Sequence, residues 1–207
     1  MLEMASLGAK VMQPASIQEA RLNRIEIDVR STFSKMSGTL ITKKKDILSK
    51  NTIRGISFTK NDAKLTLIGV KDKPGIAASI FKPLYENSIN VDMVVQNVSA
   101  GGRETDLTFT IKLEDLKKTR KLVENNKYIK FRKLIVNKNV SKVSIVGVGM
   151  VTTPGITYRM FRALAKKKIN IEVISTSEIK ISVLIDKKNL KKSVEILHQE
   201  FKLSNSL

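Results

Sequence analysis

The sequence predicts an α+β fold of two ferredoxin-like units, each with the element order β-α-β-β-α-β, which share or exchange a strand. An internal repeat is the main reason: LTLIGV at residues 65–70 recurs as VSIVGV at residues 143–148, and PGI at 74–76 recurs at 154–156. Within each copy, apolar residues change from alternating to helical spacing and back. The hydrophobic content of 42% also exceeds that of a disordered chain, despite the many charges.

Residues 1–42 precede the repeat and predict two short helices followed by a strand. Apolar residues have helical spacing over residues 2–11, and the pattern resumes after Pro14 with Ile17, Ala20 and Leu22. The alternation IEIDV at residues 25–29 indicates a half-buried strand. Residues 43–52 are polar and rich in lysine without apolar periodicity, so we interpret them as a linker.

The first unit is assigned to residues 53–137, and its repeated part begins with the strand at 65–70. A stripe of apolar residues at helical spacing, from Ile76 to Leu84, predicts its first helix. The elements expected after this helix are a strand from residue 89, a strand at 107–111, a helix at 113–126 and a strand at 131–136. A right-handed crossover places both helices on one face of an antiparallel sheet.

The second unit is assigned to residues 138–207 and ends soon after its second helix. Its expected elements are a strand at 143–148, a helix from 156, a strand from 169, a strand at 181–185 and a helix at 190–201. The last strand of the ferredoxin-like pattern is therefore missing from this copy. Residues 52–58, TIRGISF, are the candidate to supply it, and the two units would then not be independent.

The charge balance leaves an alternative open. Lys and Arg number 38 against 19 Asp and Glu, which gives a net charge of +19 and suggests nucleic acid as a partner. Most of these residues are lysines spread along the chain, which favours a solvated surface instead. A ferredoxin-like RNA-binding module reads bases with aromatic residues on its central strands. The expected strands at 65–70, 107–111, 143–148 and 181–185 carry only one aromatic residue, Phe109. We retain the nucleic-acid module as the alternative and expect no nucleic-acid partner.

The residue types present exclude several kinds of chemistry. Cysteine is absent and histidine occurs once, so disulfides, thiolate zinc sites, cysteine nucleophiles and multi-histidine metal sites are excluded. No serine, histidine and carboxylate fall in a recognisable arrangement, and we predict no catalytic residue and no metal site. No apolar run approaches the length of a membrane span, and the N-terminal residues lack a secretory pattern. We expect a cytoplasmic chain without a membrane partner.

One binding site is suggested by polar residues at the start of the first repeat helix. Asp72 and Pro74 precede this helix, whose free N–H groups and partial positive charge can bind a small carboxylate. Asp92 on the next strand could hold an ammonium group, with Asn90 and Gln96 as polar partners. Together these groups would bind an amino acid. Simple helix capping by Asp72 and polarity at a strand edge explain the same residues equally well.

Four segments carry a resemblance to a known family. They are GVKDKPG at residues 69–75, INVDMVVQN at 89–97, TDLTF at 105–109 and ISTSEIKISV at 174–183. Occurring in this order, they resemble the regulatory region of aspartate kinase, a pair of ACT domains, over about residues 50–203. Residues 1–42 resemble the end of that family's amino-acid kinase domain. The family's Lys-Phe-Gly-Gly segment and most of its nucleotide-binding domain have no counterpart here, so the resemblance implies a separate regulatory subunit or a truncated product.

The resemblance implies ligands, partners and site residues. Aspartate kinases phosphorylate aspartate with ATP on the way to lysine, threonine and methionine, and their ACT domains bind lysine and/or threonine as feedback inhibitors. ATP and magnesium would bind only in the missing kinase domain, and this chain would hold no cofactor. A homodimer, or a complex with a kinase-containing chain through the ACT domains, is implied. The implied effector-binding residues are Asp72, Ala77, Asn90, Val91, Asp92, Gln96, Ile156, Thr157, Asn170, Ile171 and Ser177.

Overall fold

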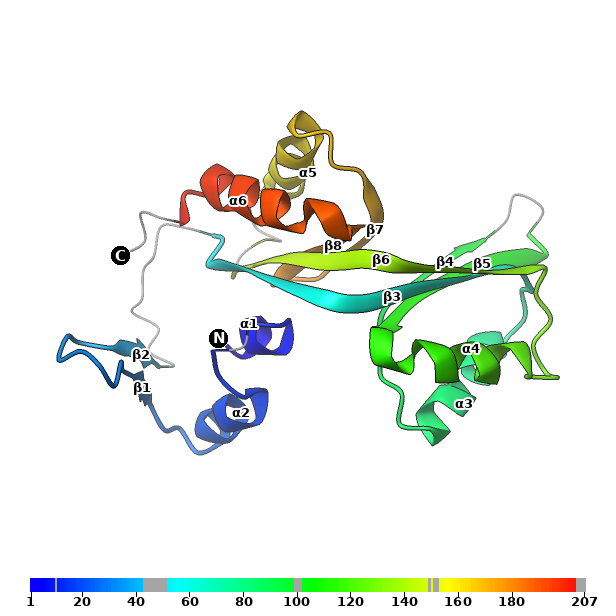
Figure 1. The fold of residues 1–207 in the computed structure, drawn as a ribbon, viewed down its shortest axis with the longest axis horizontal. Helices are drawn as coiled ribbons and strands as arrows, with labels where there is room; N and C mark the ends of the chain where they lie inside the picture. The colour runs from blue at the N-terminus through cyan, green and yellow to red at the C-terminus, as the bar shows by residue number, and fades with distance from the viewer. Residues whose placement is uncertain (10, 43–51, 99–101, 149, 151–152, 204–207) are drawn as a thin grey trace.

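A computed structural model describes residues 1–9, 11–42, 52–98, 102–148, 150 and 153–203. Its largest element is a six-stranded antiparallel sheet with the strand order β4-β5-β3-β6-β8-β7 (Figure 1). The strands are β3 (Gly55–Lys71), β4 (Val91–Val98), β5 (Glu104–Lys112), β6 (Lys133–Val146), β7 (Ile171–Thr176) and β8 (Lys180–Asp186). The α+β class predicted from the repeat is confirmed.

The two central strands, β3 and β6, run through both units. Residues 55–59 of β3 pair with residues 142–146 of β6, whereas residues 64–68 of β3 pair with residues 133–137. The register shifts between these two stretches, near Asp62, which marks a bulge. The first unit consists of the second half of β3, then β4, β5 and the first half of β6. The second unit consists of the second half of β6, β7, β8 and the first half of β3.

The predicted sharing of a strand is therefore confirmed. The first half of β3 precedes the first unit in sequence, yet it lies beside the part of β6 that pairs with β8. It supplies the strand that the second repeat lacks. The boundary that we propose between the units, at residues 137 and 138, lies inside β6, where the strand passes from one unit to the other.

The helices lie on opposite sides of this long strand pair (Figure 1). In the first unit, α3 (Ile76–Glu86) and α4 (Leu116–Glu124) form one side, and in the second unit α5 (Ile156–Lys166) and α6 (Leu190–Glu200) form the other. Short 3₁₀ turns, Leu113–Asp115 and Lys187–Asn189, precede α4 and α6. The predicted helix at 113–126 is thus a 3₁₀ turn followed by a shorter α-helix.

Each unit has its own apolar core, as the helical stripes predict. In α3 the buried residues are Ile76, Ile80 and Leu84, and in α5 they are Ile156, Met160, Ala163 and Leu164. The two cores are separate clusters on the two helix-covered faces. Burying a side chain of this size stabilises the fold by about 1.5–3 kcal/mol, so the stripes account for the docking of both helices.

The N-terminal segment forms a separate small assembly. It contains α1 (Leu2–Ser6), α2 (Pro14–Leu22) and a two-stranded sheet of β1 (Ile27–Val29) and β2 (Thr39–Ile41). The Ser57 Oγ donates to the Met4 carbonyl oxygen at 3.1 Å and links α1 to β3. Several large apolar side chains of this segment are exposed: Val11, Leu22, Ile25, Phe33, Met36 and Leu40. The predicted linker at 43–52 lies outside the described residues except for Thr52.

Candidate functional site

The start of α3 is an exposed turn with no side-chain cap. Gly75 is the N-cap residue and has a φ of 87°, a left-handed conformation that glycine adopts without cost. The backbone N–H of Asp72 donates to the Arg103 carbonyl oxygen at 3.0 Å, which ties the turn to β5. The expectation that Asp72 caps the helix is wrong, because the left-handed Gly75 takes the cap position. The Asp72 side chain thus does not cap the helix, whose N-terminus has no side-chain cap.

A shallow opening of about 370 Å³ lies at this helix N-terminus. Its lining residues are Asp72, Lys73, Pro74, Gly75, Ile76, Ala77 and Gln96. Three of the predicted effector-binding residues, Asp72, Ala77 and Gln96, therefore meet at one place. The opening combines a carboxylate, an amide side chain and the positive end of a helix dipole, which are groups that can receive the ammonium and carboxylate of a small zwitterion.

Asn90 and Val91 line a different hollow of about 510 Å³. It lies beside the C-terminal half of α3 and the start of β4, where Phe81, Tyr85 and Val94 also contribute. Tyr85 is 82% exposed and Val94 is 47% exposed, so this is an open apolar surface. The structure thus separates Asn90 and Val91 from Asp72 and Gln96, although the sequence grouped them.

The Asp92 carboxylate is already paired with an ammonium group of this chain, that of Lys142. The two side chains form an ion pair, and that of Lys142 is 6% exposed. Asp92 lines neither of the two openings described above. A ligand's ammonium group would therefore have to compete with Lys142 for this carboxylate.

Burial raises the pKa of the neighbouring carboxyl group of Asp62. Three other groups act on it: the Thr59 hydroxyl donates to it and Lys142 attracts it, which oppose the rise, while the charge of Asp92 adds to it. The carboxylates of Asp62 and Asp92 therefore both interact electrostatically with Lys142 at the middle of the sheet. This electrostatic arrangement lies where β3 passes between the units.

The predicted residues of the second unit are distributed in the same manner. Ile156 is buried at the start of α5, Thr157 and Asn170 are exposed, and Ile171 is half-buried at the start of β7. The backbone N–H of Ser177 donates to the Lys180 carbonyl oxygen at 2.8 Å in the turn before β8. In the repeat, Thr157, Asn170 and Ile171 occupy the positions of Ala77, Asn90 and Val91.

Sequence reasoning missed the residue equivalent to Asp92. Glu172 occupies the same position in the second repeat, and its carboxylate contacts the Lys64 Nζ at 2.5 Å. Asn137 Nδ2 donates to both oxygens of this carboxylate, at 3.2 and 3.3 Å. The alignment of the two copies pairs Glu172 with Asp92 and Lys142 with Lys64, but repetition alone does not reveal which residues are in contact.

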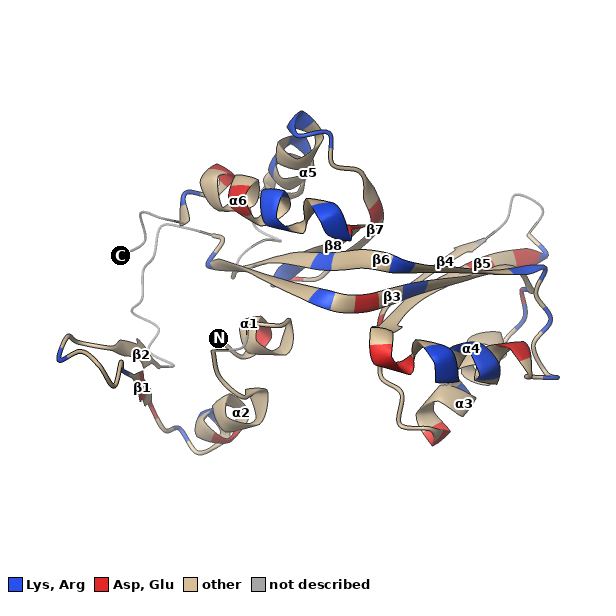
Figure 2. Cartoon of the chain, in the orientation of Figure 1, with Lys and Arg blue, Asp and Glu red and all other residues tan. Residues whose placement is uncertain are grey.

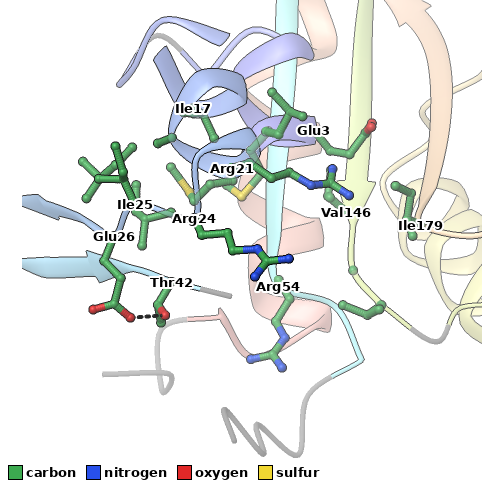
Figure 3. Close-up of a pocket in the computed structure, with 18 residues that line it drawn as sticks. Glu3, Ile17, Arg21, Arg24, Ile25, Glu26, Thr42, Arg54, Val146 and Ile179 are labelled. Atoms are coloured by element: carbon green, nitrogen blue, oxygen red, sulfur yellow. Dashed lines mark hydrogen bonds between the residues drawn. The ribbon is translucent and has the colours of Figure 1, made fainter. Parts of the chain in front are cut away.

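A cavity of about 620 Å³, larger than the two openings described above, lies between the N-terminal segment and the end of β6. Its wall is mainly apolar and includes Ile17, Ile25 and Val146 (Figure 3). Arg21 and Arg24 also line it, and Figure 3 shows the Arg21 side chain extending toward Glu3 and Val146. None of the predicted effector-binding residues lines this cavity.

The positive charge is distributed over the whole molecule. Figure 2 shows Lys and Arg on the helices of both units and along the central strands. Phe109 is fully buried and packs against Phe81 with ring centroids 5.3 Å apart, so it offers no surface for base stacking. Among the described residues, no group of three or more acidic or histidine side chains could hold a metal ion. No helix within the described ranges is long and apolar enough to span a membrane.

The fold and its repeated motifs define a pair of ACT domains. The family model for the ACT domain matches residues 65–126 and 143–201, one match in each unit. The aspartate kinase of Pseudomonas putida is 44% identical over 98% of this chain and 50% of its own length. The chain spans about half the length of such curated relatives.

Solved structures support the same assignment. The regulatory subunit of the aspartate kinase from Thermus thermophilus, in its ligand-free form, is 36% identical with a TM-score of 0.68, and the match covers 72% of this chain and 99% of that one. A structure of aspartokinase alpha and beta subunits is 39% identical with a TM-score of 0.66, covering 73% and 99%. The chain belongs to the aspartate kinase family and corresponds to its C-terminal regulatory region with tandem ACT domains.

Proposed function

We propose that this chain is the feedback-sensing portion of an aspartate kinase and binds free lysine and/or threonine. The observation that carries the proposal is the opening at the start of α3, where Asp72, Ala77 and Gln96 surround an uncapped helix N-terminus. The free helix amides would bind the ligand's carboxylate, and the Asp72 carboxylate would bind its ammonium group. Gln96 can donate to or accept from the ligand's side chain.

Binding would control a kinase reaction that other parts of the protein perform. The whole enzyme would phosphorylate the side-chain carboxylate of aspartate with ATP, and the ATP and magnesium would bind in the kinase domain. The exposed apolar residues of the N-terminal segment support this arrangement. Phe33 is 99% exposed and Met36 is 78% exposed, as expected of a surface that packs against the rest of a larger domain.

The ACT units would also associate with a second chain, either a copy of this chain or one that contains a kinase domain. The edge strands β4 and β7 each pair with one neighbour only in the sheet, and such edges are suited to association. The open apolar hollow beside α3 and β4, with Tyr85 and Val94, supports a contact on this side of the first unit. We place the chain in the cytoplasm, where its proposed ligands are made.

Calorimetry of the purified chain with lysine and with threonine tests the effector role. We expect heat of binding for at least one of them, and a rise in melting temperature of the bound chain. Asp72→Asn removes the charge that would hold the ammonium group, so the affinity should fall by about tenfold or more, since a charged hydrogen bond contributes about 1.5–3 kcal/mol.

Glu114→Gln is the matched control, because it removes one exposed negative charge outside the opening. Its affinity should equal that of the unchanged chain. Absence of binding heat for both amino acids at millimolar concentration, with a folded chain, would contradict the proposal.

A further inference from the structure

Among the residues that the structure describes, two ion pairs connect the two units, and each takes its lysine from one unit and its carboxylate from the other. The first joins Asp92 on β4, in the first unit, to Lys142 on β6. Lys142 stands opposite Leu184 of β8 and Thr59 in the register of the sheet, which places it in the second unit. This pair therefore spans the boundary between the units.

In the second pair the units are exchanged: the lysine belongs to the first unit and the carboxylate to the second. Lys64 on β3 stands opposite Thr110 of β5 and Asn137 of β6, which places it in the first unit. Its partner Glu172 belongs to β7 in the second unit, and Asn137 supports the same carboxylate from the first. We refer to Asp92–Lys142 and Glu172–Lys64 as the crossed pairs.

The internal repeat explains why the crossed pairs resemble one another. Lys64 immediately precedes the first repeated strand, as Lys142 precedes the second, and Asp92 and Glu172 follow Asn-Val and Asn-Ile in equivalent positions. Equivalent residues of two similar units form equivalent contacts when the units are related by an approximate two-fold rotation. The crossed pairs are therefore a symmetric feature of the interface.

The surroundings of the crossed pairs make them strong. The side chains of Lys64 and Glu172 are each 19% exposed, and that of Lys142 is 6% exposed. Between the edge strands β4 and β7, an apolar cluster joins the two units beside the ion pairs. It consists of Met93, Val140, Val173 and Leu184, with Val95 packed against them. The Asp92 side chain is 50% exposed, so loss of a partner leaves a largely buried charge at Lys142, Lys64 or Glu172 but not at Asp92.

We propose that the crossed pairs act as a two-way latch that fixes the edge strand of each unit to the other unit. β4 carries Asp92 near its start and Gln96, which lines the opening at α3, further along. A movement of β4 at the opening would therefore be transmitted to Lys142 and the second unit. This transmission rests on the proposed effector role, whereas the latch itself does not. Coupling between two sites is reciprocal, so a change in the second unit would alter the opening equally.

Hydrogen exchange of the full chain without ligand tests the latch. In Lys142→Met, we expect amides of β4 to exchange about tenfold faster or more, because β4 loses the charged contact that joins Asp92 to the second unit. In Lys64→Met, the same acceleration should occur in β7. The strand whose amides exchange faster should thus belong to the unit that does not contain the substituted lysine. Lys138→Met, at an exposed position of β6, is the matched control and should change neither strand.

The isosteric changes Asp92→Asn and Glu172→Gln test the same pairs if a lysine variant does not fold, and should release β4 and β7 respectively. For the lysine variants, acceleration confined to the substituted lysine's own unit would overturn the latch. For the carboxylate variants, acceleration in β4 or β7 no larger than in Lys138→Met would overturn it. Binding of lysine and threonine to the unchanged chain is measured separately. Failure of binding with release of the opposite strand would remove the effector role and leave the latch standing.

Discussion

Asp62 lies in the middle of β3, where the strand passes from the second unit to the first. Burial raises the pKa of its carboxyl group above the ordinary value of 3.8. At pH values between the ordinary pKa of 3.8 and the raised pKa in the folded chain, the Asp62 carboxyl group is protonated more often in the folded chain than in the unfolded chain. The contribution of Asp62 to stability therefore falls as the pH rises through this range and stays unfavourable above it.

Replacing Asp62 by Asn should consequently raise stability at neutral pH. Asn keeps an oxygen that can accept from the Thr59 hydroxyl, but it has no charge to be desolvated. We expect the melting temperature at pH 7 to rise by about 2 °C, the usual effect of somewhat less than 1 kcal/mol in a chain of this size. The gain should shrink as the pH is lowered toward 4. Thermal unfolding across this pH range measures it.

The control for this prediction is Asp28→Asn, which removes the same charge at an exposed position of β1. It should not reproduce the gain. A lower melting temperature of Asp62→Asn at pH 7 would show that attraction between Asp62 and Lys142 outweighs the cost of burial.

At the scale of elements, the repeat helices α3 and α5 begin in the same unusual way. Both have a left-handed glycine as N-cap, Gly75 with a φ of 87° and Gly155 with a φ of 90°. Apart from the adjacent residues, no atom of the described part of the chain lies within 4 Å of the position that a Cβ would occupy at either glycine. A side chain there meets no steric obstacle, so its cost is that of the backbone conformation alone.

This geometry predicts equal effects of the same substitution in both units. Gly75→Ala and Gly155→Ala should each lower the free energy of unfolding by about 1–2 kcal/mol, the cost of a left-handed conformation for a residue with a Cβ. Gly75→Asn should cost less, because asparagine adopts this conformation more readily. Urea unfolding measures all three variants. An alanine variant as stable as the unchanged chain would indicate that the turn changes conformation.

For the whole molecule, the shared strand makes the second unit depend on residues that precede the first. Ile53 is 4% exposed and belongs to the apolar core under α5 and α6, although the whole first unit separates it from them in sequence. Ile53→Ala should therefore destabilise the chain by about 2–5 kcal/mol. Hydrogen exchange should accelerate in α5 and α6 more than in α3 and α4.

Ile135→Ala is the control for this prediction, since Ile135 lies on the first-unit half of β6 and is 39% exposed. Its effect should be smaller. If Ile53→Ala instead accelerated exchange mainly in α3 and α4, residues 52–58 would belong to the first unit in solution.

Much of the fold could be predicted from the sequence because its signals are local. The apolar stripe in α3 and its copy in α5 identify helices, and the repeat identifies two similar units. Of the predicted site residues, Asp72, Ala77 and Gln96 line one opening, whereas Asp92 forms an ion pair with Lys142, and their role in binding an effector stays a prediction. Which face of the sheet a strand residue occupies depends on bulges and twist, such as the register shift between Val91 and Val94 in β4. The periodicity of apolar residues in the sequence does not show such a shift.

The sequence by itself determined the number of units, their element order and the family to which the chain belongs, since each follows from residue types at fixed spacing. The sequence also indicated that a strand is shared, but only the tertiary structure decided which strands and side chains join the units. The division of β3 and β6 between both units, and the contacts of Lys64 with Glu172 and of Lys142 with Asp92, bring together residues far apart in the chain. Such contacts depend on how two apolar cores pack against one sheet, and no local pattern of residues encodes them.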